Sequence, residues 1–314
     1  MKELEVNRFE WVGTNVSEQE KIGRPSINYL RDGLNRLRKN KAAIFSIVVI
    51  TFIVLLAIII PMVMPYGISE QHLTNCRNQG LFFTSDAEDG HLHLLGTDKF
   101  GRDTFVRICY GGRISLFIAL AVVCINFIIG VVYGGISGYL GGFIDNIMMR
   151  IIEVINSIPF LIIVILLMMI MPPGVLAIIV AYAATGWTSM ARMVRGQVMS
   201  LKEQEFIIAG QSMGARPMRI ILKHLVPNTL SIVIVQLTLE IPNVIFTEAT
   251  LSFLGLGVPV PLASWGTLAN DAVKVFQSYP MQLIIPALCI SMTMLAFNLL
   301  GDGLRDAFDP KLRR

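Results

Sequence analysis

Six stretches of mostly apolar residues, each long enough to cross a membrane as a helix, stand out in the pattern of hydrophobic and polar positions. A helix needs about 20 such residues to cross a hydrocarbon core ~30 Å thick, because it rises ~1.5 Å per residue. The sequence therefore predicts an all-α polytopic membrane protein with six transmembrane helices. The predicted spans are 42–64, 114–137, 151–171, 174–191, 229–256 and 283–301.

Proline and glycine refine these spans. Pro172 and Pro173 separate the third span from the fourth, since proline does not continue a helix. The fifth span exceeds the length of one crossing, so we expect it to tilt or to bend at Pro242. A glycine recurs every four residues from the second span into the segment that follows it, and this predicts a smooth ridge against which another helix packs. The glycines are Gly130, Gly134, Gly138 and Gly142.

Positive charge between the spans predicts their orientation. Residues 1–41 contain nine Lys and Arg, whereas the loop 65–113 contains five and the loop 257–282 contains one. Cytoplasmic loops near membrane helices carry the excess of positive charge. We therefore expect both termini in the cytoplasm, an extracytoplasmic loop 65–113, a five-helix core 114–301 and a cytoplasmic C-terminus 302–314.

The N-terminal tail 1–41 ends in an amphipathic pattern. Its apolar side chains share one helical face and cations fill the rest, which is typical of a helix lying on lipid. A plain positive flank of the first span explains the charges equally well, and nucleic-acid binding is disfavoured because topology already explains them. The apolar positions are Ile27, Leu30, Leu34 and Leu37.

Composition and missing motifs narrow the function. Only 15% of the residues are charged, against ~25% in soluble domains, and the mean hydropathy is +0.64. The chain has no GxxxxGK[ST] phosphate loop, so we expect no ATP hydrolysis by this chain alone. HExxH and GxSxG are absent as well. We predict a protein that is not an enzyme and that has no cofactor and no metal centre.

Two residue pairs in the loop 65–113 leave alternatives open. His91 and His93 have a spacing that could bind a metal, but no cysteine lies close to them in sequence. Cys76 and Cys109 could form a disulfide or remain free thiols, since the sequence does not place their Cα atoms.

The polar segment 195–228 predicts an ordered helix-turn-helix. Ser200 and Glu203 have the spacing of a capping box at a helix start. Gly214 suits a left-handed helix end, Pro217 suits the first turn of the next helix, and Pro227 is expected to close that helix. Small residues around the turn allow either another protein or this chain's own spans to approach the backbone closely.

This segment resembles the EAA loop of ABC importer permeases, which docks as a coupling helix in a groove of the ATPase subunit. The resemblance lies in Ala209, Gly210 and Gly214, followed by His224 to Pro227. The glutamate that names the loop is replaced by Ile208, so a specific polar role for it does not carry over. The resemblance implies an ATPase-coupling set at Glu205, Ala209, Gly210, Gly214, Ala215 and Arg216.

Three further stretches are similar to the oligopeptide and dipeptide branch of these permeases, specifically the C-type subunit. They are His93–Asp98 with Gly101–Asp103, Thr247–Gly257 with Ser264–Gly266, and Asn298–Asp306 with Asp309–Pro310. The resemblance implies the type I importer permease fold in the cell membrane. It also implies a second permease chain as a heterodimer partner, two cytoplasmic ATPase subunits and an extracytoplasmic peptide-binding protein.

Two acidic residues lie within the fifth span. Glu240 lies near the bilayer centre, where an ionisable group is costly unless it faces water or a partner, so it is a candidate for the transport pathway. A buried carboxyl group held by a neighbouring helix is the alternative. Glu248 belongs to the motif Thr247–Gly257 and is expected nearer the outer face, in the gate region.

The resulting hypothesis is a permease subunit that imports peptides. Nickel is the alternative substrate, because related permeases carry it and no residue here decides the question. A stand-alone channel or ion-coupled carrier is the alternative from another class. Such carriers are commonly built from inverted repeats, and we find no internal repeat in this sequence.

Overall fold

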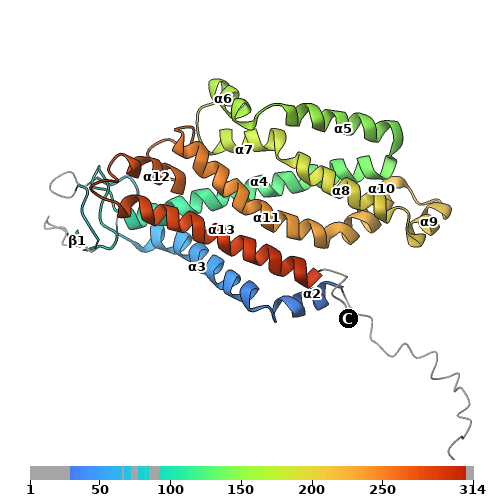
Figure 1. The fold of residues 1–314 in the computed structure, drawn as a ribbon, viewed down its shortest axis with the longest axis horizontal. Coiled ribbons are helices and arrows are strands. Elements are labelled where there is room, and N and C mark those ends of the chain that lie inside the picture. The colour runs from blue at the N-terminus through green and yellow to red at the C-terminus, as the bar shows by residue number, and fades with distance from the viewer. Residues whose placement is uncertain (1–28, 66, 72–76, 82, 85–91, 309–314) are drawn as a thin grey trace, which may run out of the picture.

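The computed structural model describes residues 29–65, 67–71, 77–81, 83–84 and 92–308. Long helices run side by side along one axis, with the short strands at one end and α9 (Glu205–Ser212) at the other (Figure 1). Residues Ile27, Cys76 and His91 lie outside the described residues.

Helices dominate the regular structure of the described residues, as the hydrophobic pattern predicts, and the extended structure there is one short strand pair and an isolated bridge between Thr97 and Asp103. Strands β1 (Phe83–Thr84) and β2 (Leu92–His93) pair antiparallel. The helices before the central break are α2 (Tyr29–Leu37), α3 (Lys41–Val63), α4 (Thr104–Leu140), α5 (Gly142–Ser157) and α6 (Phe160–Ile170). Those after it are α7 (Val175–Thr185), α8 (Trp187–Leu201), α9, α10 (Pro217–Ile220), the π-helical turn η2 (Ile221–Leu225), α11 (Val226–Phe253), α12 (Trp265–Val273) and α13 (Met281–Phe308).

Five helices in the described residues are long and apolar enough to cross a membrane, or six if α5 and α6 count as one bent span. The bend between α5 and α6 is 78° and lies at Ile158 and Pro159. The predicted break at Pro172 and Pro173 separates α6 from α7. Pro242 lies buried inside α11, which continues through it.

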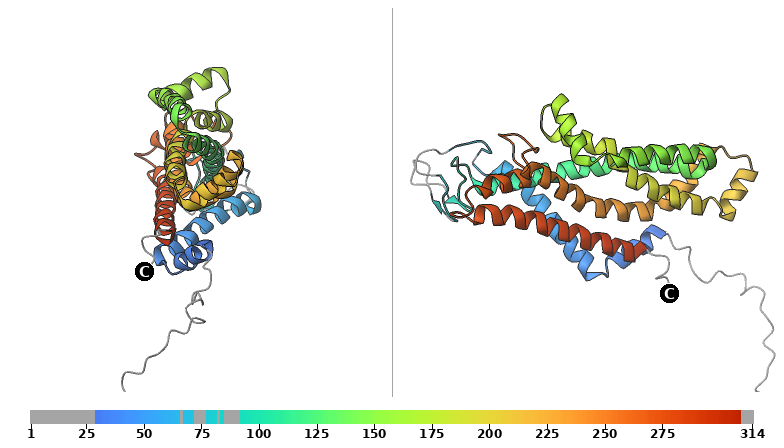
Figure 2. Two further views of the ribbon diagram at one scale, coloured as in Figure 1. Left: turned by 90° about the vertical axis from the view of Figure 1, so that its right-hand side faces the viewer. Right: turned by 45° about the horizontal axis from the view of Figure 1, so that its top comes forward.

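Helix α4 is the centre of the bundle and packs along α8, α11 and α3. In Figures 1 and 2, α5 and α6 lie along one edge of the bundle, and α3 and α2 lie along the opposite edge. The main apolar core lies between these helices and includes Ile118, Val122, Ile178 and Ile245.

The glycine ridge is confirmed for three of its four positions. A Cβ atom on Gly134 would lie 2.3 Å from the Ala191 carbonyl oxygen, and a Cβ on Gly130 or Gly138 would lie 2.6 Å or 2.7 Å from the nearest atom of α8. Glycine thus allows α4 and α8 to touch through their backbones. The fourth position, Gly142, begins α5 after a turn and has open space where its Cβ would be, so it does not belong to the ridge.

The amphipathic tail segment forms α2, which packs against the end of α13. Leu37 is buried with Ala43 and Ala307, whereas Leu34 is exposed. Part of the apolar face therefore contacts protein, and part of it is left for lipid.

Helix α4 contains the predicted second span and extends beyond it, beginning at Thr104 because Asp103 caps it by accepting a hydrogen bond from the Val106 amide. Two local expectations were wrong. Ser200 caps no helix: α8 continues to Leu201, and α9 starts only after Gln204.

Pro227 does not close a helix. The chain from Pro217 to Phe253 is one continuous helical span. In η2 the Val226 amide donates to the Ile221 carbonyl, a step of five residues that displaces the regular helical bonding just before the proline. Proline is tolerated there because it occupies the first turn of α11.

Candidate functional site

The segment predicted as a coupling loop is an ordered helix-turn-helix that projects from one end of the bundle (Figure 1). Gly214 has φ +78°, a left-handed conformation that costs other residues strain. The Gly214 amide donates to Gln211 and the Ala215 amide donates to Gly210, which close the end of α9. Pro217 then opens α10 as predicted.

Two buried side chains anchor this segment to the bundle. Ile207 of α9 and Ile220 of α10 are each 1% exposed and pack in one cluster with Val198 and Leu225. Because the anchors come from both helices, the turn between them is held at a fixed position relative to α8 and α11.

The predicted coupling residues separate into two groups. Four of them line one hollow of 720 Å³: Gly210, Gly214, Ala215 and Arg216. The other two, Glu205 and Ala209, are exposed on α9 and are not among the residues that line it.

The sequence prediction missed other residues that line the same hollow. They are Phe206, Met213, Arg219, Lys223 and His224. Met213 is 82% exposed, although methionine is usually buried. The sequence signal that could have identified Met213 is its position as a large apolar residue directly before the turn glycine Gly214. Exposed apolar side chains combined with cations are typical of a surface that binds another protein.

A polar network centred on Asp145 connects α4, α5 and α8. Asp145 at the start of α5 is 5% exposed and accepts two hydrogen bonds from Arg195 of α8, both of 2.5 Å. Ser137 of α4 donates a third bond to Asp145. The network therefore joins α4 and α5 to the helix that leads into α9.

Glu248 lies in a closed cluster of hydroxyl groups. Its side chain is 0% exposed and accepts hydrogen bonds from Ser115 of α4 at 2.8 Å and from Ser252 at 2.7 Å. Ser252 is 3.3 Å from Ser264, which caps α12. The Trp265 amide donates to Ser115 at 3.4 Å. Within this chain Glu248 thus connects α4, α11 and α12 and does not face an opening.

Glu240 has a more open position on α11. Its side chain is partly exposed, and it accepts a hydrogen bond from the side-chain amide of Asn126 on α4. Asn126 is 0% exposed. A neighbouring helix therefore holds one carboxyl oxygen of Glu240, while part of the side chain remains accessible within this chain.

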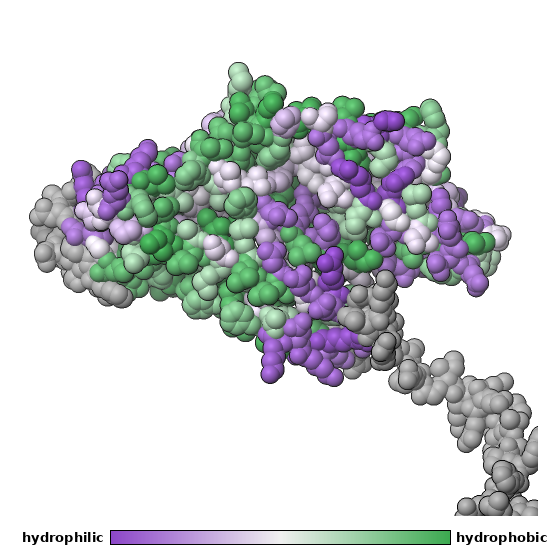
Figure 3. Space-filling view, in the orientation of Figure 1, coloured by the Kyte–Doolittle hydropathy of each residue, from purple (hydrophilic) through white to green (hydrophobic). Residues whose placement is uncertain are grey.

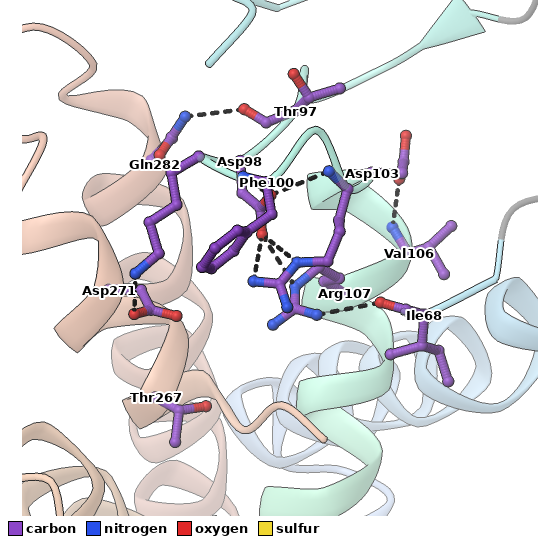
Figure 4. Close-up of polar contacts among 12 residues, drawn as sticks. Ile68, Thr97, Asp98, Phe100, Asp103, Val106, Arg107, Thr267, Asp271 and Gln282 are labelled. Carbon is purple, nitrogen blue, oxygen red and sulfur yellow. Dashed lines mark hydrogen bonds and ion pairs between the residues drawn. The ribbon is translucent and has the colours of Figure 1, made fainter. Parts of the chain in front are cut away.

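At the opposite end of the bundle, Asp98 organises the loop before α4 (Figure 4). Its carboxylate accepts bonds from the Phe100 amide and from the amide and guanidinium of Arg102. The Arg107 guanidinium lies 3.6 Å from the same carboxylate and donates to the Ile68 carbonyl. One partly buried carboxylate and two buried arginines therefore fix this loop on the start of α4.

The same loop is attached to α12 and α13. Lys99 forms an ion pair of 2.7 Å with Asp271 of α12, and Gln282 of α13 donates to the Thr97 carbonyl (Figure 4). His93 Nδ1 lies 2.7 Å from the Asp103 carboxylate, and both side chains are buried. Within this chain His93 therefore has a carboxylate partner. No group of three potential metal ligands occurs among the described residues.

Two family models match different parts of the chain. Residues 130–314 match the family model of the binding-protein-dependent transport system inner membrane component. Residues 28–80 match the N-terminal transmembrane domain of oligopeptide transport permease C.

Curated relatives align along almost the whole chain. The chain is 46% identical to the oligopeptide transport system permease protein OppC of Bacillus subtilis, and the alignment covers 100% of both chains. It is 48% identical to the dipeptide transport system permease protein DppC of the same organism, over 97% of this chain and 94% of the relative. The chain belongs to the OppC/DppC family of ABC transporter permeases. OppC of Escherichia coli strain K12 is 41% identical over 95% of this chain and 96% of that protein.

Family membership confirms the predicted class and fold. The chain is a multi-pass inner-membrane permease component and not the catalytic subunit. It belongs to binding-protein-dependent ABC transport, which implies an ATPase and a binding protein as partners. A stand-alone channel or ion-coupled carrier is thereby excluded.

Proposed function

We propose that this chain is one transmembrane subunit of an ATP-driven importer that moves oligopeptides or dipeptides across the cytoplasmic membrane. The observation that carries the proposal is the sequence identity of this chain to known permeases. Over nearly the full length, the identity is 46% to an oligopeptide permease and 48% to a dipeptide permease. In this proposal a second permease chain completes the membrane domain as a heterodimer. Two cytoplasmic ATPases and an extracytoplasmic peptide-binding protein complete the complex.

The α9–α10 segment is the proposed contact with an ATPase subunit. It projects from the bundle, its turn is anchored at Ile207 and Ile220, and the hollow beside the turn is lined by cations and exposed apolar side chains. In this role Glu205 and Ala209 contribute from the exposed surface of α9. Gly210, Gly214, Ala215 and Arg216 contribute from the hollow.

The proposed orientation places both termini and the α9 end in the cytoplasm. The excess of Lys and Arg in residues 1–41 and 192–228 supports this orientation. The Asp98 loop then faces the exterior, on the side from which a binding protein delivers its peptide.

The two intramembrane acids take different roles in this proposal. Glu240, which is partly exposed, belongs to the transport pathway. Glu248 holds α12 against α4 and α11 near the outer gate through its bonds to Ser115 and Ser252.

Uptake by cells tests the substrate directly. A strain that lacks this chain is compared with the same strain carrying it on a plasmid, using labelled dialanine, labelled trialanine and radioactive nickel ion. We expect deletion to abolish uptake of the peptides and to leave nickel uptake unchanged. Loss of nickel uptake with normal peptide uptake would assign the chain to the nickel branch instead.

A further inference from the structure

Helix α11 carries a line of five polar side chains along one face. They are Gln236, Glu240, Asn243, Thr247 and Thr250, and each is at least partly exposed in this chain. The spacing alternates between four residues and three, so at 100° per residue all five lie within about 40° of one line. From first to last they extend ~21 Å along the helix, about two thirds of the hydrocarbon thickness.

This face differs from the outward faces of α3 and α13. Those helices expose large apolar side chains such as Phe52 and Leu288, and exposed polar residues such as Thr51 and Ser291 occur singly. In the space-filling view, hydrophilic surface extends into the otherwise hydrophobic middle of the molecule (Figure 3). A continuous polar face is costly against lipid, because lipid offers no hydrogen bonds. The polar line on α11 therefore faces water or polar groups in the assembled membrane domain.

The hydrogen bonds along this face determine its chemistry. The hydroxyls of Thr247 and Thr250 donate to the carbonyls of Asn243 and Phe246, and Asn243 donates to Leu239. Since these hydrogens are used within the helix, the hydroxyl oxygen of Thr250 remains as an acceptor, whereas Thr247 also has a side-chain hydrogen bond with Tyr182 of α7. The face thus presents mainly hydrogen-bond acceptors, which fit N–H donors of a passing molecule.

Glu240 places an ionisable carboxyl group at the middle of the line. Asn126 donates to one of its carboxyl oxygens, and the other makes no hydrogen bond to any described residue. Charged carboxylates bind ammonium groups more strongly than neutral acceptors bind amides. Toward the start of α11, Gln236 lines a hollow of 230 Å³ between α11 and α13 that also includes Arg305. The line thus leads from the membrane interior to an open space beside the end of α13.

We propose that the face Gln236–Glu240–Asn243–Thr247–Thr250 lines a water-filled passage and contacts the peptide in transit, with Glu240 binding its N-terminal ammonium group. This inference rests on the proposed function and adds the surface over which the peptide moves. Acceptors that bind backbone N–H groups recognise any peptide regardless of its side chains. The face therefore fits a substrate that is defined by its backbone and its free amino end.

Cysteine accessibility tests whether the face is wet. In a version without the native cysteines, Asn243→Cys and Thr247→Cys are compared with Leu288→Cys and Leu295→Cys, which replace exposed apolar residues of α13. A charged, membrane-impermeant thiosulfonate is applied to assembled complexes in membranes. We expect the two α11 cysteines to react about tenfold or more faster than the α13 pair, because only a thiolate in water reacts. Added trialanine should slow the α11 reactions.

Each result decides the inference. Reaction at the α11 positions as slow as at the α13 positions would overturn it and would indicate that a helix of the second permease chain covers the face. Fast reaction without protection by trialanine would overturn the peptide contact while leaving the passage wet.

Trialanine uptake by the cysteine-free complex is measured in parallel. If that complex imports no peptide while the native complex does, the accessibilities are measured with the native cysteines retained. If the native complex imports none, the proposed function itself fails.

A second measurement uses the native cysteines and needs no labelling. Glu240→Gln should lower trialanine uptake by about fivefold or more, because a charge-assisted bond to the ammonium group is lost. Glu240→Asp should retain most of the uptake. Recovery of the assembled complex is measured for both variants, so that uptake is compared at equal amounts of complex. Equal uptake by the Gln variant and the native chain would remove Glu240 from the pathway.

Discussion

Glu248 is a carboxyl group held inside the bundle by neighbouring hydroxyls. Ser115 and Ser252 both donate to it, and Ser115 in turn accepts the Trp265 amide. Such a cluster is stable only while each member has its partner, since a buried polar group without one costs most of its desolvation energy. The cluster thereby makes the position of α12 depend on one side chain of α11.

Truncation of Glu248 tests this dependence. Glu248→Ala should destabilise the purified chain by about 2–4 kcal/mol, because it leaves a cavity and unpaired hydroxyls. Glu248→Gln keeps the shape and hydrogen-bonding capacity and should cost less than about 1.5 kcal/mol. Thermal unfolding in detergent gives the comparison, with Met292→Ala at an exposed position of α13 as the control. A melting temperature for Glu248→Ala equal to that of the control would show that the hydrogen bonds of Glu248 do not stabilise the bundle.

Sequence reasoning finds the intramembrane acids but not their partners. Glu240 and Glu248 stand out because each is ionisable within an apolar run. Asn126 and Ser115 do not stand out, since single polar residues are common in membrane helices and their contacts depend on how α4 and α11 pack. The pair Asp145 and Arg195 was missed for the same reason, because 50 residues separate its members in sequence.

At the scale of elements, the turn between α9 and α10 is the feature on which transmission depends. Gly214 has a left-handed backbone, and no atom lies within 4 Å of the position that a Cβ would take. Within this chain, a substitution there is therefore opposed by backbone strain rather than by a clash. A larger side chain would extend into the surface that we assign to the ATPase contact.

Substitutions at Gly214 should affect coupling in proportion to size. Gly214→Ala adds ~1 kcal/mol or more of strain and should weaken peptide-stimulated ATP hydrolysis modestly. Gly214→Leu also adds bulk at the contact and should nearly abolish the stimulation. Gly196→Ala is the matched control, because Gly196 is exposed on α8, has open space and has no left-handed backbone. ATPase co-purification and stimulated hydrolysis are measured in reconstituted complexes. Normal stimulation in the Leu variant would exclude this turn from transmission.

The helices themselves were largely predictable, whereas several of their ends were not. Apolar length located five of the six predicted spans on helices long enough to cross a bilayer, since crossing sets a length that composition alone reveals. The third predicted span, 151–171, instead contains the 78° bend between α5 and α6. The ends depend on local bonding that composition does not reveal. The hydrogen bond of Asp103 extends α4 outward, and the π-helical turn before Pro227 joins α10 to α11.

At the scale of the whole molecule, the bundle has two functionally different ends. The α9 end carries exposed cations and apolar side chains, and the opposite end is fixed by the network of Asp98, Arg102 and Lys99. The two ends are joined by α4, α11 and α13, which run most of the length of the bundle (Figure 1). A displacement at one end can therefore reach the other through continuous helices.

Reporter fusions test which end faces the cytoplasm. An enzyme reporter that is active only in the cytoplasm should be active when fused after Arg195 or after Arg314, and inactive when fused after Gln277. A reporter active only outside should give the inverse pattern. The reason is the positive charge in the loops nearest to the first two sites. A reversed pattern at Arg195 or at Arg314 would overturn the proposed orientation.

The central claim is that this chain moves peptides only as part of an ATP-driven complex. The most direct measurement is trialanine uptake into proteoliposomes that contain both permease chains and the two ATPases, with binding protein outside and ATP inside. The account predicts accumulation that stops when ATP, the ATPases or the binding protein is omitted. Trialanine accumulation by the permease chains alone, without ATP, would contradict it.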